Sequence, residues 1–271
     1  MMRPQSPIEG VLFDVDGVFH VDGVAIPGAA AALGRVRQRG IPFRLLTNTT
    51  VRSRRSLGVL MRDLGFDVAD DEIITAGGAA AAWVRQKHPG AAVYLLGSGD
   101  VAEEFDGIEL TDGDHAGVVV IGDAAENFTY AAMNHAFRLL LNGATLVAMH
   151  RDPWWMTSSG PTIDAGAFIR GLEFASGVRS RLVGKPSAPF FRAGFQSLGL
   201  PPHVTAMVGD AIRQDLVPAM RMGATGVLVR TGKYREEDLA HGTPDIALDS
   251  VVDIERVRSF RNACVSLLSG V

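Results

Sequence analysis

An α/β fold built on a mostly parallel sheet is predicted for this 271-residue chain from three observations. Short apolar runs alternate with segments of helical periodicity, which is typical of parallel strands joined by helical crossovers. Several of these runs end in carboxylate, hydroxyl or amide side chains. The stretch between Thr47 and Lys185 is also far longer than one crossover requires. Together these features predict a Rossmann-like, doubly wound parallel sheet with an inserted domain.

The expected elements follow one another in the order that this fold requires. Apolar runs predict strands at residues 11–15, 42–46, 92–96, 118–121, 145–148, 204–208 and 226–229. Helical patterns predict helices at residues 29–39, 53–64, 130–141, 189–198 and 250–268, and the alanine-rich segment 77–82 is expected to begin another.

The stretch between Thr47 and Lys185 holds at least three strands and two helices of its own. We therefore expect an inserted α/β cap domain at residues 76–180. The core domain is then discontinuous and comprises residues 1–75 and 181–271.

The segment IEGVLFDVDGVFH, residues 8–20, carries the most informative pattern. It is an apolar strand that runs into Asp14 and Asp16 and then a glycine. A strand places alternate residues on the same side, so the two carboxylates point together beyond its end. Like charges repel unless a cation neutralises them, and hard cations such as Mg²⁺ prefer oxygen ligands. The alternative is a strand followed by an ordinary Asp-Gly turn.

Three further motifs follow in a fixed order. RLLTNTT (44–50) is a strand that ends in Thr47 and Asn48, and LVGKPS (182–187) presents Lys185 in a turn. VTAMVGDAIRQD (204–215) is a strand that ends in Asp210, with Asp215 after it. Each motif is weak alone, but their order is specific: an acid pair, a hydroxyl, a lysine and a second acid pair.

In this order the four motifs resemble the signature motifs of the haloacid dehalogenase superfamily, most of whose members are phosphatases. The resemblance covers nearly the whole chain and is greatest for the large-cap, NagD-type phosphatases (subfamily IIA). In that group the cap lies between the second and third motifs. Four segments also resemble phospholysine/phosphohistidine inorganic pyrophosphate phosphatase and its hydrolase-domain relatives: TNTT (47–50), residues 118–140, LVGKPSAPFF (182–191) and VRTGKYR (229–235).

The resemblance implies catalytic roles for two aspartates. Asp14 would be the nucleophile that forms an aspartyl-phosphate, which splits hydrolysis into two easier steps. Asp16 would be the general acid/base. The relatives of the narrower group carry serine at the position that matches Asp16. Because this chain has aspartate at that position, general acid/base catalysis is better supported here. The same difference weakens the inference that this chain shares the substrate preference of those relatives.

The resemblance also implies how a phosphoryl group would be bound. Thr47 would donate a hydrogen bond to a phosphoryl oxygen, helped by backbone N–H groups near Asp16, Gly17 and Asn48. Lys185 would offset the negative charge of the nucleophile and the phosphate. Positioning and fixed positive charge are most of what phosphoryl transfer requires.

The cofactor implied by the resemblance is Mg²⁺. Asp14 and Asp210 would be its carboxylate ligands, and the main-chain carbonyl of Asp16 would be another. Asp215 would either support the metal through water or orient Lys185.

Candidate substrate contacts in the cap lie in AMHRDPWWMTSSG, residues 148–160. His150 and Arg151 are expected to bind a second anionic group, and Trp154 or Trp155 to form a wall of the pocket. In the alternative, the tryptophans pack the cap or a dimer interface and Arg151 is a surface charge. The resemblance further implies a homodimer that forms through the cap.

Composition agrees with a cytoplasmic enzyme that acts on a small phosphorylated substrate. The net charge of −4 offers no basic field for nucleic acid, and no apolar run is long enough to span a bilayer. The only cysteine, Cys264, lies in an apolar C-terminal stretch, so we expect it to be a packing residue in a reducing compartment. The N-terminus lacks the apolar region of a secretory signal.

One pattern points elsewhere. Residues 97–102 read G-x-G-x-x-A between an expected strand and an expected helix, which is the dinucleotide-binding pattern. It falls inside the expected cap, and no acidic strand end follows at the usual spacing. We therefore expect a plain strand, turn and helix.

The sequence thus predicts a Mg²⁺-dependent phosphatase of small phosphorylated compounds, with pyrophosphate and phosphoamides among the candidates. A specific sugar-phosphate or glycerol-phosphate phosphatase of the NagD type is one alternative. A catalytically weak scaffold that binds phosphorylated ligands is the other.

Overall fold

The computed structural model describes residues 7–157 and 160–257. The chain forms two compact units. The first comprises residues 1–47, 58–74 and 188–271, and the second comprises residues 48–57 and 75–187. The expected division into a core (1–75 and 181–271) and a cap (76–180) remains a proposal.

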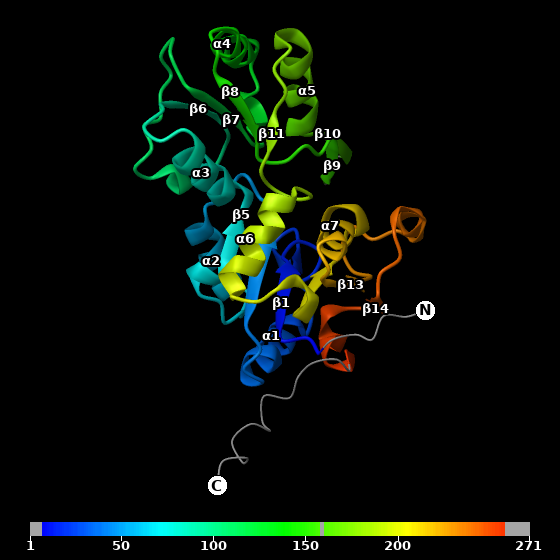
Figure 1. Ribbon diagram of the computed structural model, residues 1–271. Coiled ribbons are helices and arrows are strands. Elements are labelled where there is room, and N and C mark those ends of the chain that lie inside the picture. The colour runs from blue at the N-terminus through cyan, green and yellow to red at the C-terminus, as the bar shows by residue number, and fades with distance from the viewer. Residues whose placement is uncertain (1–6, 158–159, 258–271) are drawn as a thin grey trace. The chain divides into compact units, whose positions relative to one another are not determined.

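The first unit is built on a six-stranded sheet in the order β14-β13-β12-β1-β4-β5 (Figure 1). β12, β1 and β4 are adjacent and parallel, and β13 and β14 continue the parallel sheet beyond β12. The strands are β1 Gly10–Asp14, β4 Phe43–Thr47, β5 Ile73–Thr75, β12 Thr205–Gly209, β13 Thr225–Val229 and β14 Ile246–Leu248.

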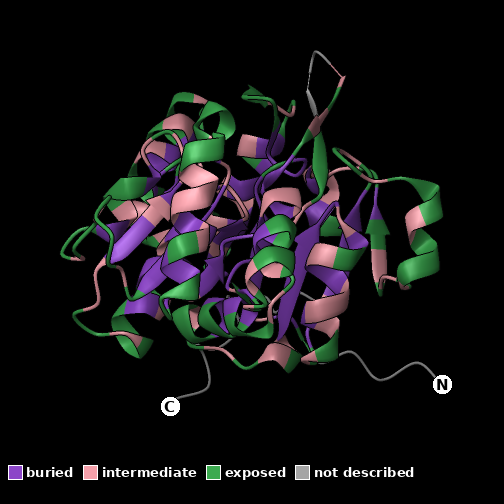
Figure 2. Ribbon diagram, turned by 90° about the horizontal axis from the view of Figure 1, so that it is seen from above, coloured by how far each residue is buried: buried purple, intermediate pink, exposed green. Residues whose placement is uncertain are grey.

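Helices cover this sheet and explain why its two central strands, β1 and β12, are mostly apolar. Every residue of β1 and β12 is buried, and the buried strands are visible in purple in Figure 2. A parallel strand that is buried on both faces reads as a continuous apolar run. α6 contacts β1 and β4, and α7 contacts β13. The helices that lie in this unit are α1 Ala29–Gln38, α6 Ala188–Leu198 and α7 Val217–Arg221, and α2 Arg54–Asp63 begins in the second unit and ends here.

The second unit has its own parallel sheet in the order β11-β8-β7-β6. Alternate residues of β7 face opposite sides: Val119 and Ile121 pack with α4 and α5, whereas Val118 and Val120 pack with α3. The sheet is therefore covered on both faces. The elements are β6 Val93–Leu96, β7 Val118–Ile121, β8 Thr145–Ala148, β11 Arg181–Leu182, α3 Ala76–Lys87, α4 Tyr130–Leu141 and α5 Ala165–Ser176.

Two short antiparallel hairpins were not predicted. β2 (His20–Val21) pairs with β3 (Val24–Ala25) just after the first motif, and β9 (Trp154–Thr157) pairs with β10 (Gly160–Ile163) in the second unit. Both are too short for a clear alternation of apolar and polar residues, which explains why the sequence did not reveal them.

The predicted α/β class with a parallel-sheet core is confirmed. Each strand that the sequence predicted is present to within one residue, and so are the helices expected at 29–39, 53–64, 130–141 and 189–198. The predicted helix at 250–268 is a 3₁₀ segment at Val251–Arg256 in its described part. Residues 258–271, including Cys264, lie outside the described residues. Among the described residues, no helix has the length and apolar character needed to cross a membrane.

The glycines of the G-x-G-x-x-A pattern serve packing in the second unit. β6 is followed by a turn and the short 3₁₀ helix Val101–Phe105. A Cβ on Gly99, which has a φ of 63°, would lie 2.0 Å from the carbonyl oxygen of Val51. The N–H of Asp100 donates to that same oxygen. Gly99 is therefore explained by close approach to the 48–53 loop.

Candidate active site

Three carboxylates of the first unit form a buried group. Asp14 ends β1, Asp210 follows β12 directly, and Asp215 lies one π-helical turn farther on. Their ligand atoms all lie within 4.8 Å of one another, and their exposed fractions are 6%, 1% and 0%. β1 and β12 are adjacent and parallel, so their carboxyl ends bring Asp14 and Asp210 together. This is the position at which open α/β sheets bind ligands.

The chemistry of this group fits a hard divalent cation. Three neighbouring carboxylates repel one another, and buried charge is costly unless it is paired or bound to a metal. All three side chains offer oxygen, which Mg²⁺ prefers, whereas zinc sites usually include nitrogen or sulfur ligands. Asp14, Asp210 and Asp215 are therefore the residues that would hold Mg²⁺, directly or through water.

Two glycines allow the backbone to approach Asp210 closely. A Cβ on Gly17 would lie 2.1 Å from an oxygen of Asp210, and a Cβ on Gly232 would lie 2.2 Å from the same oxygen. The N–H of Lys233 donates to that oxygen at 2.6 Å, and the hydroxyl of Thr231 donates to the carbonyl of Gly17. Gly17 was expected to bind phosphate through its backbone; here it also packs against Asp210.

The 231–233 turn was missed as part of the site. It lies in the segment VRTGKYR (229–235), whose resemblance to the relatives predicted no role for it. Gly232, three residues after β13 ends at Val229, was the available indication, because a glycine there marks a turn where another part of the chain can approach closely.

Asp16 and Thr47 lie together at the same edge of the sheet. Thr47 ends β4, which is adjacent to β1, and its hydroxyl donates to Oδ2 of Asp16 at 3.3 Å. Thr47 is fully buried, whereas the side chain of Asp16 is 51% exposed. The structure thus brings together Asp14, Asp16, Thr47 and Asp210 at the carboxyl ends of three neighbouring strands.

Asn48 and Lys185 belong to the second unit and are bound to each other. The side-chain oxygen of Asn48 accepts from the backbone N–H of Lys185 at 2.8 Å, and its amide donates to the Lys185 carbonyl at 3.1 Å. Lys185 is 3% exposed. The side chain of Asn48 therefore holds the lysine turn, a role that the sequence did not predict; its expected role was a backbone contact to phosphate.

The loop that contains Asn48 is held by other loops of the second unit. The N–H of Ser53 donates to Asp100 at 2.6 Å, and the N–H of Asp123 donates to the hydroxyl of Thr50 at 2.8 Å. The Ser53 hydroxyl also donates to Glu103 at 2.9 Å. These contacts order the backbone directly after Thr47, which explains why residues 47–53 are rich in hydroxyl side chains.

His150 is buried in a cluster with two aspartates of the second unit. Its Nε2 lies 3.5 Å from Asp164, which begins α5, and its Nδ1 lies 3.6 Å from Asp152. Burial lowers the pKa of His150, but the contacts with Asp152 and Asp164 outweigh it, so the pKa lies above the usual value for histidine. His150 was expected to bind an anion of the substrate; here it joins the end of β8 to the start of α5.

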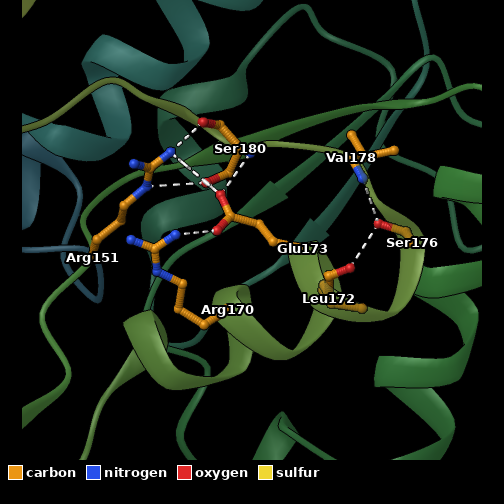
Figure 3. Close-up of polar contacts among 7 residues, drawn as sticks. All are labelled: Arg151, Arg170, Leu172, Glu173, Ser176, Val178 and Ser180. Carbon is orange, nitrogen blue, oxygen red and sulfur yellow. Dashed lines mark hydrogen bonds and ion pairs between the residues drawn. The ribbon is translucent and has the colours of Figure 1, made fainter.

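Arg151 is part of a polar network around Glu173 (Figure 3). Its Nε donates to the Ser180 hydroxyl at 3.0 Å, and its guanidinium also donates to the Ser180 carbonyl. Glu173 of α5 accepts from the N–H and hydroxyl of Ser180 at 2.8 and 2.6 Å and from Arg170 at 2.7 Å. Arg151 was expected to bind a second anionic group. In the structure its Nε and Nη2 atoms contact Ser180 and Glu173, and so connect the segment after β8 to α5 and to the segment before β11.

Trp154 and Trp155 lie on the hairpin strand β9, with exposed fractions of 50% and 41%. The base of this hairpin is closed by backbone hydrogen bonds from Asp164 to Pro153 and from Gly166 to Asp152. Both tryptophans are thus partly exposed on a hairpin with an ordered base. Contact with substrate and contact with a partner subunit remain the two proposals for them.

We expect Glu173→Gln to destabilise the second unit by about 1–3 kcal/mol at neutral pH, because it weakens hydrogen bonds to a charged, mostly buried acceptor. Burial by itself would raise the pKa of Glu173. Hydrogen bonds from Ser180 and Arg170 and the charge of Arg151 lower the pKa by more than burial raises it, so the pKa in the folded protein lies below 4.5. The stabilisation is therefore complete above pH 4.5 and is lost as the pH falls through the folded pKa.

Urea unfolding followed by tryptophan fluorescence measures this effect where it occurs, since Trp83, Trp154 and Trp155 all belong to the second unit. Glu126→Gln, at an exposed position, is the matched control and should leave the unfolding free energy unchanged. A difference between wild type and Glu173→Gln that stays constant from pH 7 to below pH 4.5 would contradict the assigned role of the ionised carboxylate.

Comparison with known proteins identifies the class to which this fold and site belong. The family model described as haloacid dehalogenase-like hydrolase matches residues 11–111, and a second model of hydrolases of this kind matches residues 182–254. Haloacid dehalogenase-like hydrolase domain-containing protein 2 of Bos taurus is 37% identical over 92% of this chain and 95% of its own length. Phospholysine phosphohistidine inorganic pyrophosphate phosphatase of Bos taurus is 36% identical over 91% of both chains.

Solved structures agree with this class. p-Nitrophenyl phosphatase from Archaeoglobus fulgidus superposes with a TM-score of 0.85 at 29% identity, covering 92% of this chain and 99% of its own. NagD from E. coli K-12 superposes with a TM-score of 0.82 at 29% identity, covering 91% and 98%. The chain belongs to the haloacid dehalogenase-like hydrolases and is a phosphatase of that family. The predicted resemblance to the NagD-type group is confirmed.

Proposed function

We propose that this phosphatase depends on Mg²⁺ and hydrolyses small phosphorylated compounds through an aspartyl-phosphate on Asp14. The observation that supports this most is the buried group of Asp14, Asp210 and Asp215 at the carboxyl ends of adjacent parallel strands. When bound, Mg²⁺ would neutralise negative charge on the phosphoryl group and the carboxylates.

The side chains of this protein supply the other parts of the proposed reaction. A carboxylate oxygen of Asp14 attacks phosphorus, and Asp16 gives its proton to the ester oxygen as the bond from phosphorus to that oxygen breaks. A water molecule then attacks the phosphorus, Asp16 takes a proton from it, and the bond to Asp14 breaks to release phosphate. When substrate is bound, the Thr47 hydroxyl donates to a phosphoryl oxygen in place of Asp16, and Lys185 offsets negative charge.

The names of similar proteins define the substrates to be tried first. Phospholysine, phosphohistidine and inorganic pyrophosphate appear in the name of one relative, and one similar structure is named a p-nitrophenyl phosphatase. Similarity to NagD keeps the sugar-phosphate and glycerol-phosphate alternative open. Because Asp16 is present, an ordinary phosphate ester with a poor leaving group is also a reasonable substrate, since such an ester needs a proton donor.

The remaining parts of the proposal concern selectivity and assembly. We propose that His150 and Arg151 bind a second anionic group of the substrate and that Trp155 forms a wall of the pocket. The contacts of His150 and Arg151 also order the segment that leads to the hairpin of Trp155. We also propose a homodimer that forms through the cap and a cytoplasmic location. Light scattering of the purified protein tests the first of these, and fractionation of cells the second.

A screen of purified protein with and without Mg²⁺ tests the proposed function. It covers pyrophosphate, an N-phosphorylated amine, sugar phosphates, glycerol phosphate, nucleotides and p-nitrophenyl phosphate. We expect phosphate release that stops in excess chelator and returns when Mg²⁺ is added. Full activity in excess chelator would contradict the metal assignment. Binding of phosphorylated ligands without release of phosphate would support the scaffold alternative.

A further inference from the structure

His20 is a buried histidine next to the proposed general acid/base, and the proposed reaction does not use it. It begins β2, is 5% exposed, and lies four residues after Asp16. Within residues 7–157 and 160–257, neither of its ring nitrogens has a hydrogen-bond partner, and both are shielded from solvent. Its Nε2 lies 3.8 Å from Oδ1 of Asp16.

An imidazole in this state is costly. A buried polar group without a hydrogen bond destabilises the folded protein, so such groups in native structures are uncommon and need an explanation. An apolar side chain of similar size would avoid this cost. Sites that accept such a cost are often functional sites, where a group must be available for a partner during the reaction.

The backbone holds His20 in place. The N–H of Gly17 donates to the His20 carbonyl at 2.8 Å, and the N–H of Phe19 donates to Val15 at 2.9 Å, which closes a tight turn between Asp16 and His20. His20 also pairs with Ala25 of β3. Because Gly17 packs against Asp210, this turn is fixed relative to the carboxylate group. The imidazole therefore has little freedom to seek another partner.

Asp16, in contrast, needs orientation. Its side chain is half exposed, and among the described residues the contacts of its carboxylate are the Thr47 hydroxyl at Oδ2 and the His20 ring at Oδ1. A distance of 3.8 Å is beyond a hydrogen bond, but a small rotation of the carboxylate closes it. Hydrogen bonds of catalytic groups are often long in free enzymes and shorten when substrate binds.

We propose that His20 is a positioning residue that donates a hydrogen bond from Nε2 to Oδ1 of Asp16 and so holds Oδ2 toward the reacting oxygen. This inference rests on the proposed role of Asp16 as general acid/base. The hydrogen bond requires a proton on Nε2, which the imidazole ring can carry as a donor.

The test compares two variants of His20 on two substrates. His20→Leu removes the donor at similar size, and His20→Gln keeps an N–H donor near the position of Nε2. The substrates are p-nitrophenyl phosphate, whose leaving group departs without a proton, and the best alkyl phosphate found in the substrate screen, whose leaving group needs one. The value of kcat/KM reports the steps up to departure of the leaving group.

We expect His20→Leu to lower kcat/KM for the alkyl phosphate about tenfold or more, a part of the 10²–10⁴-fold that general acid catalysis contributes. Its effect on p-nitrophenyl phosphate should be several times smaller. His20→Gln should recover most of the loss. The melting temperature of His20→Leu should equal or exceed that of wild type, because two unpaired buried nitrogens are removed. His203→Leu, at an exposed histidine of the same unit, is the matched control.

Asp16→Asn and the double variant separate the inference from the proposed function. If Asp16→Asn leaves both rates unchanged, the proposed role of Asp16 is wrong. Suppose that Asp16→Asn loses activity on the alkyl phosphate. If His20→Leu then lowers kcat/KM equally for both substrates, only the inference about His20 is overturned. The same holds if the double variant shows the full losses of both single variants combined. A double variant no slower than Asp16→Asn would support it.

Discussion

Asp14→Asn is expected to abolish phosphatase turnover, with a loss on the order of 10⁴-fold, which is typical when an attacking side chain is removed. An amide is a poor nucleophile and a weaker ligand for Mg²⁺ than a carboxylate. The fold should be retained, because the N–H of Val15, which donates to Asp14 at 2.7 Å, can donate to an amide oxygen as well. Steady-state kinetics on p-nitrophenyl phosphate measure the loss.

A labelling experiment distinguishes nucleophilic attack from a structural effect. With a substrate labelled on phosphorus, rapid acid quenching should trap label on wild type and on Asp16→Asn, but not on Asp14→Asn. Asp22→Asn is the matched control, because Asp22 is exposed in the β2–β3 turn and the change in charge is the same. Activity of Asp14→Asn within about threefold of wild type would remove Asp14 from the mechanism.

Asp210→Asn is expected to weaken Mg²⁺ binding at least tenfold, because a buried carboxylate of the metal group becomes neutral. The Mg²⁺ concentration for half-maximal activity should rise accordingly. The melting temperature gives a readout that does not depend on activity: Mg²⁺ should raise it in wild type, since a ligand that binds only the folded state stabilises it. In Asp210→Asn this increase should be largely lost.

Without Mg²⁺, the melting temperature of Asp210→Asn relative to wild type shows whether the substitution itself changes the stability of the fold. The hydrogen bond from Lys233 can be kept, since an amide oxygen also accepts. Asp22→Asn again serves as the control and should keep the full response to Mg²⁺. An unchanged response in Asp210→Asn would show that the metal binds elsewhere.

Most of the fold was predictable because its strands and helices differ clearly in apolar periodicity. β1 and β12 are buried throughout and read as continuous apolar runs, whereas α4 has the periodicity of a helix with one buried face. The hairpin β9–β10 was not predicted, because its strands are short and Trp154 and Trp155 are adjacent and both partly exposed. In its described part, the helix predicted at 250–268 is a 3₁₀ segment at Val251–Arg256.

The site was predictable only in part. The motifs at Asp14 and Asp210 could be recognised, since carboxylates that follow apolar strands meet at one edge of a parallel sheet. The contacts of Asn48 with the Lys185 backbone, and of Lys233 with Asp210, join residues that are far apart in the sequence. No local pattern encodes such contacts, so they could not be predicted from spacing.

The sequence by itself determined the α/β class, the order of strands and helices, and the family to which this phosphatase belongs, because these depend on periodicity and on short motifs. Only the tertiary structure decided which side chains share an environment. It placed His20 beside Asp16 without a hydrogen bond, and it bound Arg151 to Ser180 and Glu173. The physical reason is that burial and hydrogen-bond partners depend on how distant segments pack, and a one-dimensional pattern contains neither.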